Sequence, residues 1–213
     1  MEGKSGYEVK ETNMEKLLLG IDALNFLEKE GFPVLKSLLA KDKDEAVRIA
    51  SDIGFPVALK ISSPDVVHKT ETGGIILSIR DKGEIKEAFN TFISSFAANN
   101  PEKRLEGVIV QEMGRGLELI VGVLKDQQFG SVLMFGLGGI FVEAMRDVSF
   151  RCIPIEPRDA GEMVEELQGY KAIKNPRTEI IDLSIIENFL LQISRLAEKH
   201  HTIHEMDLNP VLA

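Results

Sequence analysis

The stretch that decides the fold reads Pro56-Val-Ala-Leu-Lys-Ile-Ser-Ser-Pro-Asp-Val-Val-His-Lys-Thr-Glu-Thr-Gly-Gly-Ile-Ile76. It opens as an apolar run from Val57 to Leu59, and Lys60 interrupts this run before Ile61 resumes it. A strand that is apolar on both faces is normally buried, and an ammonium group there is costly unless an anion meets it. We therefore expect Lys60 to contact an anionic ligand, although a lysine that protects an exposed edge strand fits the same pattern equally well.

The second half of this stretch is rich in groups that bind phosphate. His68 and Lys69 precede Gly73 and Gly74, and glycine lets a backbone approach a ligand closely enough for its N–H groups to bind phosphate oxygens. Lys69 could close over phosphates as the loop moves, and the neutral imidazole of His68 could accept a phosphoryl group. Two lysines and a glycine turn between strands predict a polyphosphate site, although a lone loop histidine is more often simply exposed.

Bulk composition narrows the class of protein. The chain has 213 residues, a formal net charge of -9 and one cysteine, Cys152, and its pI is about 5.1. This acidic balance argues against general nucleic-acid binding, which needs a basic surface, but a nucleotide pocket needs only a few local cations. A single cysteine fits a reducing compartment. The hydrophobic pattern contains neither a signal peptide nor a membrane span, so we expect a cytoplasmic protein.

Periodicity and turn residues predict an α+β chain of two lobes. A capping box at Thr12–Glu15 predicts a helix through Leu27, and further helices are expected over 44–53, 84–96, 159–169 and 182–199. Strands are expected over 32–35, 56–62, 74–79, 107–113, 118–124, 131–135, 140–143, 148–155 and 203–211. The lobe boundary is expected near Gly107 to Gly116, so that residues 1–110 form the first lobe and 111–213 the second.

Residues at the predicted boundary could hold a nucleoside. Gln111, Glu112 and Met113 end one strand, where backbone groups can pair with an adenine edge while Met113 packs on the ring. Glu118 follows after a glycine-containing turn and is placed to accept hydrogen bonds from ribose hydroxyls. An ordinary β-turn with exposed polar groups explains the same spacing.

A metal site is predicted near the C-terminus. Asp207 and Asn209 lie two residues apart on an alternating strand, so one face of that strand offers a carboxylate and an amide oxygen that could bind Mg²⁺ together with substrate phosphates. Glu143 is a further candidate for the metal, and Arg151 for the γ-phosphate. The competing interpretation is a polar strand face, because Asp-x-Asn is too short to be specific.

Two other motifs carry weaker signals. Gly136-Leu-Gly-Gly139 does not complete the dinucleotide-binding fingerprint, because Phe141 stands where the third glycine is required. A tight turn between strands and a functional glycine loop both fit this motif. His200, His201 and His204 could form part of a zinc site, but a solvated helix end is favoured, because no further ligand stands at a suitable spacing.

Taken together, these motifs resemble the ATP-grasp fold and, more narrowly, the β subunits of ADP-forming acetyl-CoA synthetases. The similarity runs from about Leu17 to the C-terminus. Its strongest parts are Gly54–Lys60, Ser63–Gly74, Val108–Met113, Phe135–Glu143 and Glu205–Pro210. Several long matches in the right order are far more specific than any one of them.

The resemblance implies a nucleotide, ATP or ADP, held between two α+β lobes with Mg²⁺. Lys60 matches the family's phosphate-binding lysine, and Lys69, Gly73 and Gly74 match its mobile phosphate loop. Gln111 to Met113 match the segment that holds the adenine. Glu118 matches the acidic residue that binds the ribose, and Asp207 with Asn209 match the metal-binding strand.

The resemblance also implies a reaction and a partner. In this family acetyl-CoA, ADP and phosphate are interconverted with acetate, CoA and ATP. A larger α subunit carries the CoA site and a phosphorylated histidine, and the two subunits form a heterotetramer. His68 matches a second histidine that relays the phosphoryl group. Such a relay is needed if the CoA and nucleotide sites lie on different subunits, because transfer requires reacting atoms near contact.

One departure affects the metal assignment. ATP-grasp proteins usually continue past the Asp-x-Asn strand into another strand with a second metal carboxylate, whereas this sequence ends at Ala213. Either a tail is missing or a group such as Glu143 replaces that ligand. Two other functions stay open: a self-contained ATP-grasp carboxylate ligase that works through an acyl phosphate, and a nucleotide-sensing module without catalysis. The acyl substrate, the physiological direction and the choice between adenine and guanine are not predicted.

Overall fold

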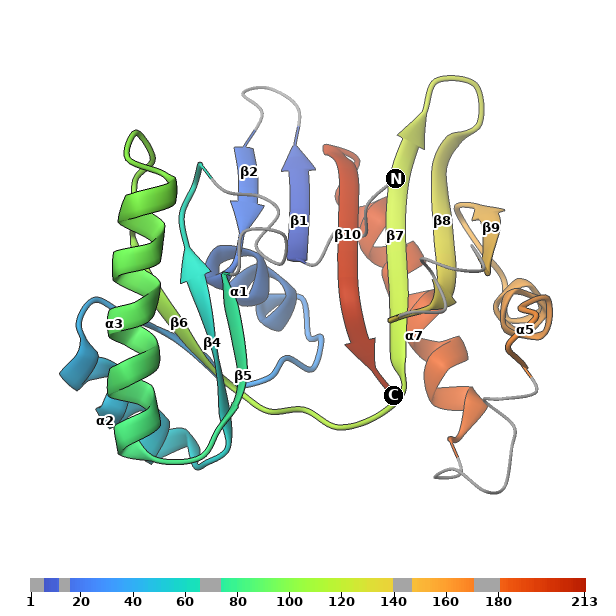
Figure 1. Cartoon of the computed structure of the whole chain (residues 1–213). Coiled ribbons are helices and arrows are strands. Elements are labelled where there is room, and N and C mark those ends of the chain that lie inside the picture. Colours follow the sequence, from blue (N-terminus) through green and yellow to red (C-terminus); the bar gives the residue numbers. More distant parts are fainter. Residues whose placement is uncertain (1–5, 12–15, 66–73, 140–146, 171–180) are drawn as a thin grey trace. The chain divides into compact units, whose positions relative to one another are not determined.

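A computed structural model describes residues 6–11, 16–65, 74–139, 147–170 and 181–213 of the chain (Figure 1). The chain divides into two compact units. The N-terminal unit comprises Leu19–Gly114, and the C-terminal unit comprises Tyr7–Leu18 together with Arg115–Ala213. The division falls between Gly114 and Arg115, and Tyr7–Leu18 near the start of the chain belongs to the C-terminal unit. None of the described helices is long and apolar enough to cross a bilayer.

The N-terminal unit is built on an antiparallel sheet with the strand order β3-β6-β4-β5. These strands are β3 (Ser37–Ala40), β4 (Val57–Ser62), β5 (Ile75–Ile79) and β6 (Gly107–Glu112). The helices are α1 (Ile21–Lys29), α2 (Lys43–Ile53) and α3 (Lys82–Asn99). Asp42 and Asp81 cap α2 and α3 by accepting hydrogen bonds from backbone N–H groups of the first turn.

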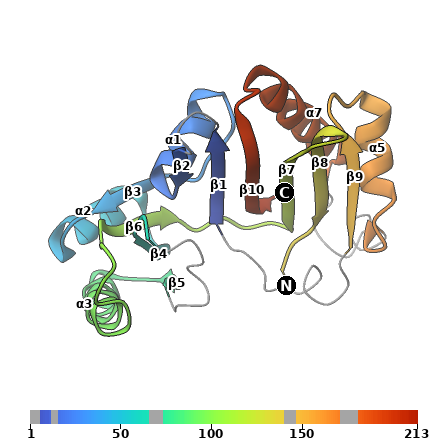
Figure 2. The ribbon, with the colours of Figure 1, turned by 90° about the horizontal axis from the view of Figure 1, so that it is seen from above.

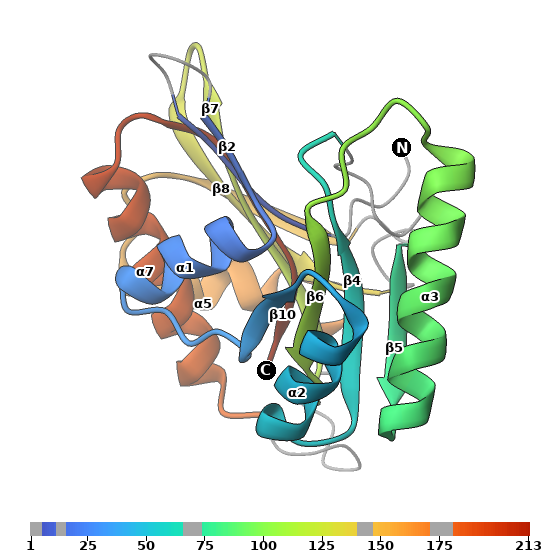
Figure 3. The same cartoon turned by 90° about the vertical axis from the view of Figure 1, so that its left-hand side faces the viewer.

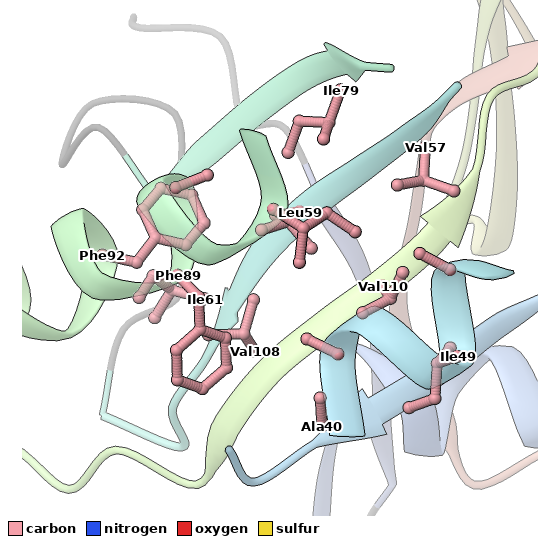
Figure 4. Close-up of a cluster of buried hydrophobic side chains, with 14 of the residues drawn as sticks. Ala40, Ile49, Val57, Leu59, Ile61, Ile79, Phe89, Phe92, Val108 and Val110 are labelled. Carbon is pink, nitrogen blue, oxygen red and sulfur yellow. The ribbon is translucent and has the colours of Figure 1, made fainter. Parts of the chain in front are cut away.

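The core of this unit lies between the sheet and the helices α2 and α3, which lie side by side in Figure 3. Alternate residues of β4 enter it, and the side chains of Val57, Leu59 and Ile61 are almost completely buried there (Figure 4). Ile49 of α2 and Phe89 of α3 pack against the same layer. The strand alternation therefore assigns one face of the sheet to the helices.

The C-terminal unit is built on a sheet with the order β2-β1-β10-β7-β8-β9. These strands are β1 (Gly6–Glu11), β2 (Lys16–Leu19), β7 (Glu118–Asp126), β8 (Gly130–Leu137), β9 (Val148–Cys152) and β10 (Ile203–Leu212). The helices α5 (Pro157–Glu165) and α7 (Leu183–Lys199) lie on one face of this sheet (Figure 2). Met206, Leu208 and Phe135 are buried beneath them.

Two predicted elements differ from the structure. The first helix begins at Ile21, and Leu17 and Leu18 lie in strand β2 instead. The apolar run Lys16–Leu19 fits either period, and its pairing in the sheet decides in favour of a strand. The strand expected over 32–35 is irregular, and strand β3 follows it at Ser37, where β6 supplies the pairing partner.

The packing in Figure 4 predicts a large difference between two leucines on neighbouring strands. Leu59 is completely buried, so Leu59→Ala should lower the free energy of unfolding by about 2–5 kcal/mol. Leu77 is 59% exposed, and Leu77→Ala should change it by less than about 0.5 kcal/mol. Urea denaturation followed by circular dichroism measures both values, and similar losses for the two variants would contradict the assignment of the core.

Candidate functional site

Lys60 lies on the face of its sheet that is opposite to α2 and α3. Its strand, β4, is flanked by β6 and β5, and Lys60 pairs with Ile109 on one side and Ile75 on the other. Because β4 lies inside the sheet, Lys60 does not serve to protect an exposed edge strand from pairing with another chain. The residue is half-buried, and its partners on the two neighbouring strands, Ile109 and Ile75, are apolar.

The described end of the predicted phosphate loop lies beside Lys60. The carbonyl oxygen of Gly74 accepts a hydrogen bond of 2.9 Å from the backbone N–H of Ile61, and Gly74 is buried. The loop therefore returns to the sheet next to the lysine. His68, Lys69 and Gly73 lie outside the described residues, so their predicted roles stay predictions.

The predicted hinge residues are held by the neighbouring strand. The buried amide of Gln111 donates a hydrogen bond of 2.7 Å to Oγ of Ser37. The backbone N–H of Glu112 donates to the carbonyl oxygen of Lys36 at 2.8 Å, and the Glu112 carboxylate accepts from the Lys36 N–H at 3.4 Å. The side chains of Gln111 and Glu112 and the backbone N–H of Glu112 are therefore already bonded within the N-terminal unit. Met113, which follows β6, is half-buried.

Glu118 begins β7 in the C-terminal unit, and its side chain is exposed. The end of β8 lies directly against it, because the N–H of Gly138 donates a hydrogen bond of 2.6 Å to the Glu118 carbonyl oxygen. A methyl group added to Gly139 would lie 3.1 Å from Oε2 of Glu118. The motif Gly136–Gly139, for which the sequence leaves a tight turn and a functional glycine loop open, thus lies against Glu118, the residue predicted to bind the ribose.

Asp207 lies on the face of its sheet that α5 and α7 do not cover. Its neighbours in sequence, Met206 and Leu208, are 1% and 2% exposed and point toward the helices, whereas Asp207 is half-buried and pairs with Gly122. Glu118 precedes Gly122 by four residues on β7, so strand alternation puts Glu118 and Asp207 on the same face.

Asn209 lies in an irregularity that simple alternation does not predict. The register between β10 and β7 shifts between Leu208 and Val211, so one extra residue is inserted at Asn209 and Pro210. Such bulges redirect side chains locally. Asp207 and Asn209 both carry side-chain oxygens, the hard donors that Mg²⁺ prefers. Glu143, the other predicted metal ligand, lies outside the described residues.

The structure does not bring Arg151 together with Asp207 and Glu118. Arg151 lies on the helix-covered face of β9, and its guanidinium donates hydrogen bonds to both carboxylate oxygens of Glu166 and, at 3.4 Å, to Glu162 on α5. The Glu166 carboxylate raises the pKa of Arg151, and the guanidinium lowers the pKa of Glu166. Contact with a γ-phosphate would require Arg151 to leave these carboxylates, so that role stays a prediction.

The histidine patch near the C-terminus lies within the described residues. His200, His201 and His204 all lie in the described part of the chain, where no group of three or more His, Cys, Asp or Glu side chains could hold a metal ion. His201 is exposed, whereas His200 and His204 are half-buried.

Comparison with known proteins assigns this chain to a family. A model described as an ATP-grasp domain matches residues 9–213. The β subunit of acetate–CoA ligase (ADP-forming) I from Pyrococcus furiosus is 39% identical over 194 residues, which cover 90% of this chain and 84% of that subunit. Acetate–CoA ligase (ADP-forming) I from Archaeoglobus fulgidus is 43% identical over 212 residues, or 96% of this chain and 31% of that protein.

Solved structures give the same result. The dinucleotide forming acetyl-coenzyme A synthetase 1 of Ca. Korarchaeum cryptofilum, in complex with coenzyme A and Ca-AMPCP, superimposes with a TM-score of 0.87 at 42% identity. The match covers 99% of this chain and 87% of that one. The chain thus spans most of the subunit relatives but only 31% and 28% of the two longer Archaeoglobus ligases. It belongs to the ATP-grasp family, and within that family it groups with the β subunits of ADP-forming acetate–CoA ligases.

Proposed function

We propose that this chain is the nucleotide-binding subunit of an ADP-forming acyl-CoA synthetase, which interconverts acetyl-CoA, ADP and phosphate with acetate, CoA and ATP. The observation that carries the proposal is the likeness to separate β subunits, which extends over 84% of the Pyrococcus subunit. The enzyme is then an acid–thiol ligase, and this chain supplies its nucleotide site.

In this proposal the phosphates of ADP or ATP meet Lys60, and the loop with Lys69, Gly73 and Gly74 covers them. The position of Lys60 inside a sheet, beside the returning end of the loop at Gly74, supports this assignment. The adenine edge pairs with the segment from Gln111 to Met113, mainly through Met113 and backbone groups. Glu118 accepts hydrogen bonds from the ribose hydroxyls.

Mg²⁺ is proposed to bind at Asp207 and Asn209, with Glu143 as a further ligand. Mg²⁺ is usually held by one or two carboxylates together with substrate phosphates and water, and the oxygen donors on β10 fit this pattern. When bound, the ion neutralises phosphate charge during phosphoryl transfer. Asp207 would offer its carboxylate on the sheet face that it shares with Glu118, and Asn209 would add an amide oxygen from the neighbouring bulge.

The phosphoryl group is proposed to travel through His68. A phosphate oxygen of ADP attacks the phosphorus, the P–N bond to the imidazole breaks, and the ring nitrogen keeps the electron pair. A larger α subunit, with the CoA site and its own phosphohistidine, would supply the phosphoryl group, and the two subunits would form a heterotetramer. In-line transfer requires reacting atoms near contact, so two distant sites need such a relay.

Loss of the Lys60 charge should weaken nucleotide binding. Lys60→Met keeps the apolar stem but removes a charge-assisted hydrogen bond worth about 1.5–3 kcal/mol, so the Kd for ADP should rise roughly 10- to 150-fold. Calorimetric titration measures the Kd. The matched control is Lys86→Met, which removes an exposed lysine of α3. Equal affinities for the two variants would exclude Lys60 from the phosphate site.

Replacement of His68 should stop phosphoryl transfer to this chain. After incubation with the α subunit and labelled ATP, His68→Asn should carry no acid-labile phosphate and should lose acyl-CoA-dependent ATP synthesis. His201→Asn, which alters an exposed histidine, is the control. Full activity of His68→Asn would favour the acyl phosphate route, and full synthesis by this chain alone would contradict the division between two subunits. Nucleotide binding with no transfer in any mixture would indicate a sensing module.

The metal requirement should depend on Asp207. Asp207→Asn removes one anionic oxygen ligand, so the Mg²⁺ concentration for half-maximal phosphorylation should rise about tenfold or more. Glu205→Gln removes the same charge two residues earlier on β10 and should leave this concentration within about twofold. An unchanged requirement in Asp207→Asn would remove this residue from the metal site.

A further inference from the structure

Two glycines at the end of β8 lie against the same glutamate, although they are twenty residues away in the sequence. Gly138 is buried, and its N–H donates a hydrogen bond of 2.6 Å to the carbonyl oxygen of Glu118. A methyl group at Gly138 would lie 2.8–2.9 Å from the backbone carbon, backbone oxygen and Cβ of Glu118. Only a residue without a side chain lets the two backbones approach this closely.

The second glycine leaves open the space beside the carboxylate itself. Gly139 has φ +64°, which favours glycine, and a methyl group at this position would lie 3.1 Å from Oε2 of Glu118. Such a contact is tighter than most van der Waals contacts, so the carboxylate would have to shift by a few tenths of an ångström. A side chain at Gly139 would therefore press against Oε2 in its present position.

We propose that Gly138 and Gly139 are positioning residues that set the direction of the Glu118 carboxylate and, through it, the recognition of the ribose hydroxyls. This inference rests on the proposed assignment of Glu118 to the ribose. Gly138 fixes the backbone of Glu118 by direct contact and a hydrogen bond. Gly139 leaves the space that the carboxylate occupies, so its effect should appear in selectivity for the sugar rather than in general nucleotide affinity.

The chain offers a matched control at the other end of the same strand. Gly130 begins β8 and has φ +75°, close to the value at Gly139, but a methyl group at Gly130 would meet nothing within 4 Å. Gly130→Ala and Gly139→Ala therefore carry a similar backbone strain in the same unit. They differ in the contact with Glu118.

The test compares ADP with 2′,3′-dideoxy-ADP, which lacks both ribose hydroxyls, by calorimetric titration with Mg²⁺ for the unaltered chain and each variant. The unaltered chain should prefer ADP by about tenfold or more, as expected for hydrogen bonds to a carboxylate. Gly139→Ala should reduce this preference several-fold, chiefly by lowering the affinity for ADP. Its affinity for dideoxy-ADP should stay within about twofold of that of the unaltered chain. Gly130→Ala should keep the preference of the unaltered chain.

A third variant, Glu118→Gln, tests the assignment of Glu118 to the ribose separately from the positioning role of the glycines. Glu118→Gln should also lose most of the preference for ADP. If Glu118→Gln loses the preference but Gly139→Ala retains it, the positioning role is wrong and the ribose assignment stands. If Glu118→Gln retains the preference, or the unaltered chain has none, the ribose assignment fails and the inference with it. An equal loss in Gly130→Ala would attribute the effect to backbone strain and would also overturn the inference.

Discussion

The alternation of side chains along two strands, β4 and β10, is the constraint on which the candidate site depends. Each strand lies inside its sheet and sends apolar residues toward a helical layer, as Leu59 and Leu208 show. The intervening residues must face the other way. Lys60 and Asp207 are therefore directed away from the helices by the same packing that stabilises each unit, and a shift of register by one residue would bury both charges.

The covered face of the C-terminal sheet uses polar residues for a different purpose. Asp147, Ser149 and Arg151 are alternate residues around β9, and all three bind α5 or the segment after it. The carboxylate of Asp147 accepts hydrogen bonds of 2.7 and 2.8 Å from the N–H groups of Gln168 and Gly169. Polarity at Arg151 thus reflects the attachment of a helix to an edge of the sheet, which local sequence does not distinguish from contact with a phosphate.

Local patterns in the sequence predict most of the elements but not the contacts between distant residues. The strand around Lys60 and the helices capped by Asp42 and Asp81 follow from short-range signals, whereas the ATP-grasp fold follows from the resemblance of several motifs in the same order. The run at Leu17 and Leu18 does not, because a partner strand determines its conformation. The bulge at Asn209 and the approach of Gly139 to Glu118 depend on the register between β7, β8 and β10. Tertiary pairing of this kind leaves no short-range signature.

The most direct test of the account is a crystal structure of this chain with ADP and Mg²⁺. The account predicts that Nζ of Lys60 lies within about 3 Å of a phosphate oxygen, and that the Asp207 carboxylate faces the same phosphate group through the metal ion. A nucleotide bound elsewhere, with Lys60 directed into solvent and away from its phosphates, would contradict the central claim that this strand presents its one charged residue to the nucleotide.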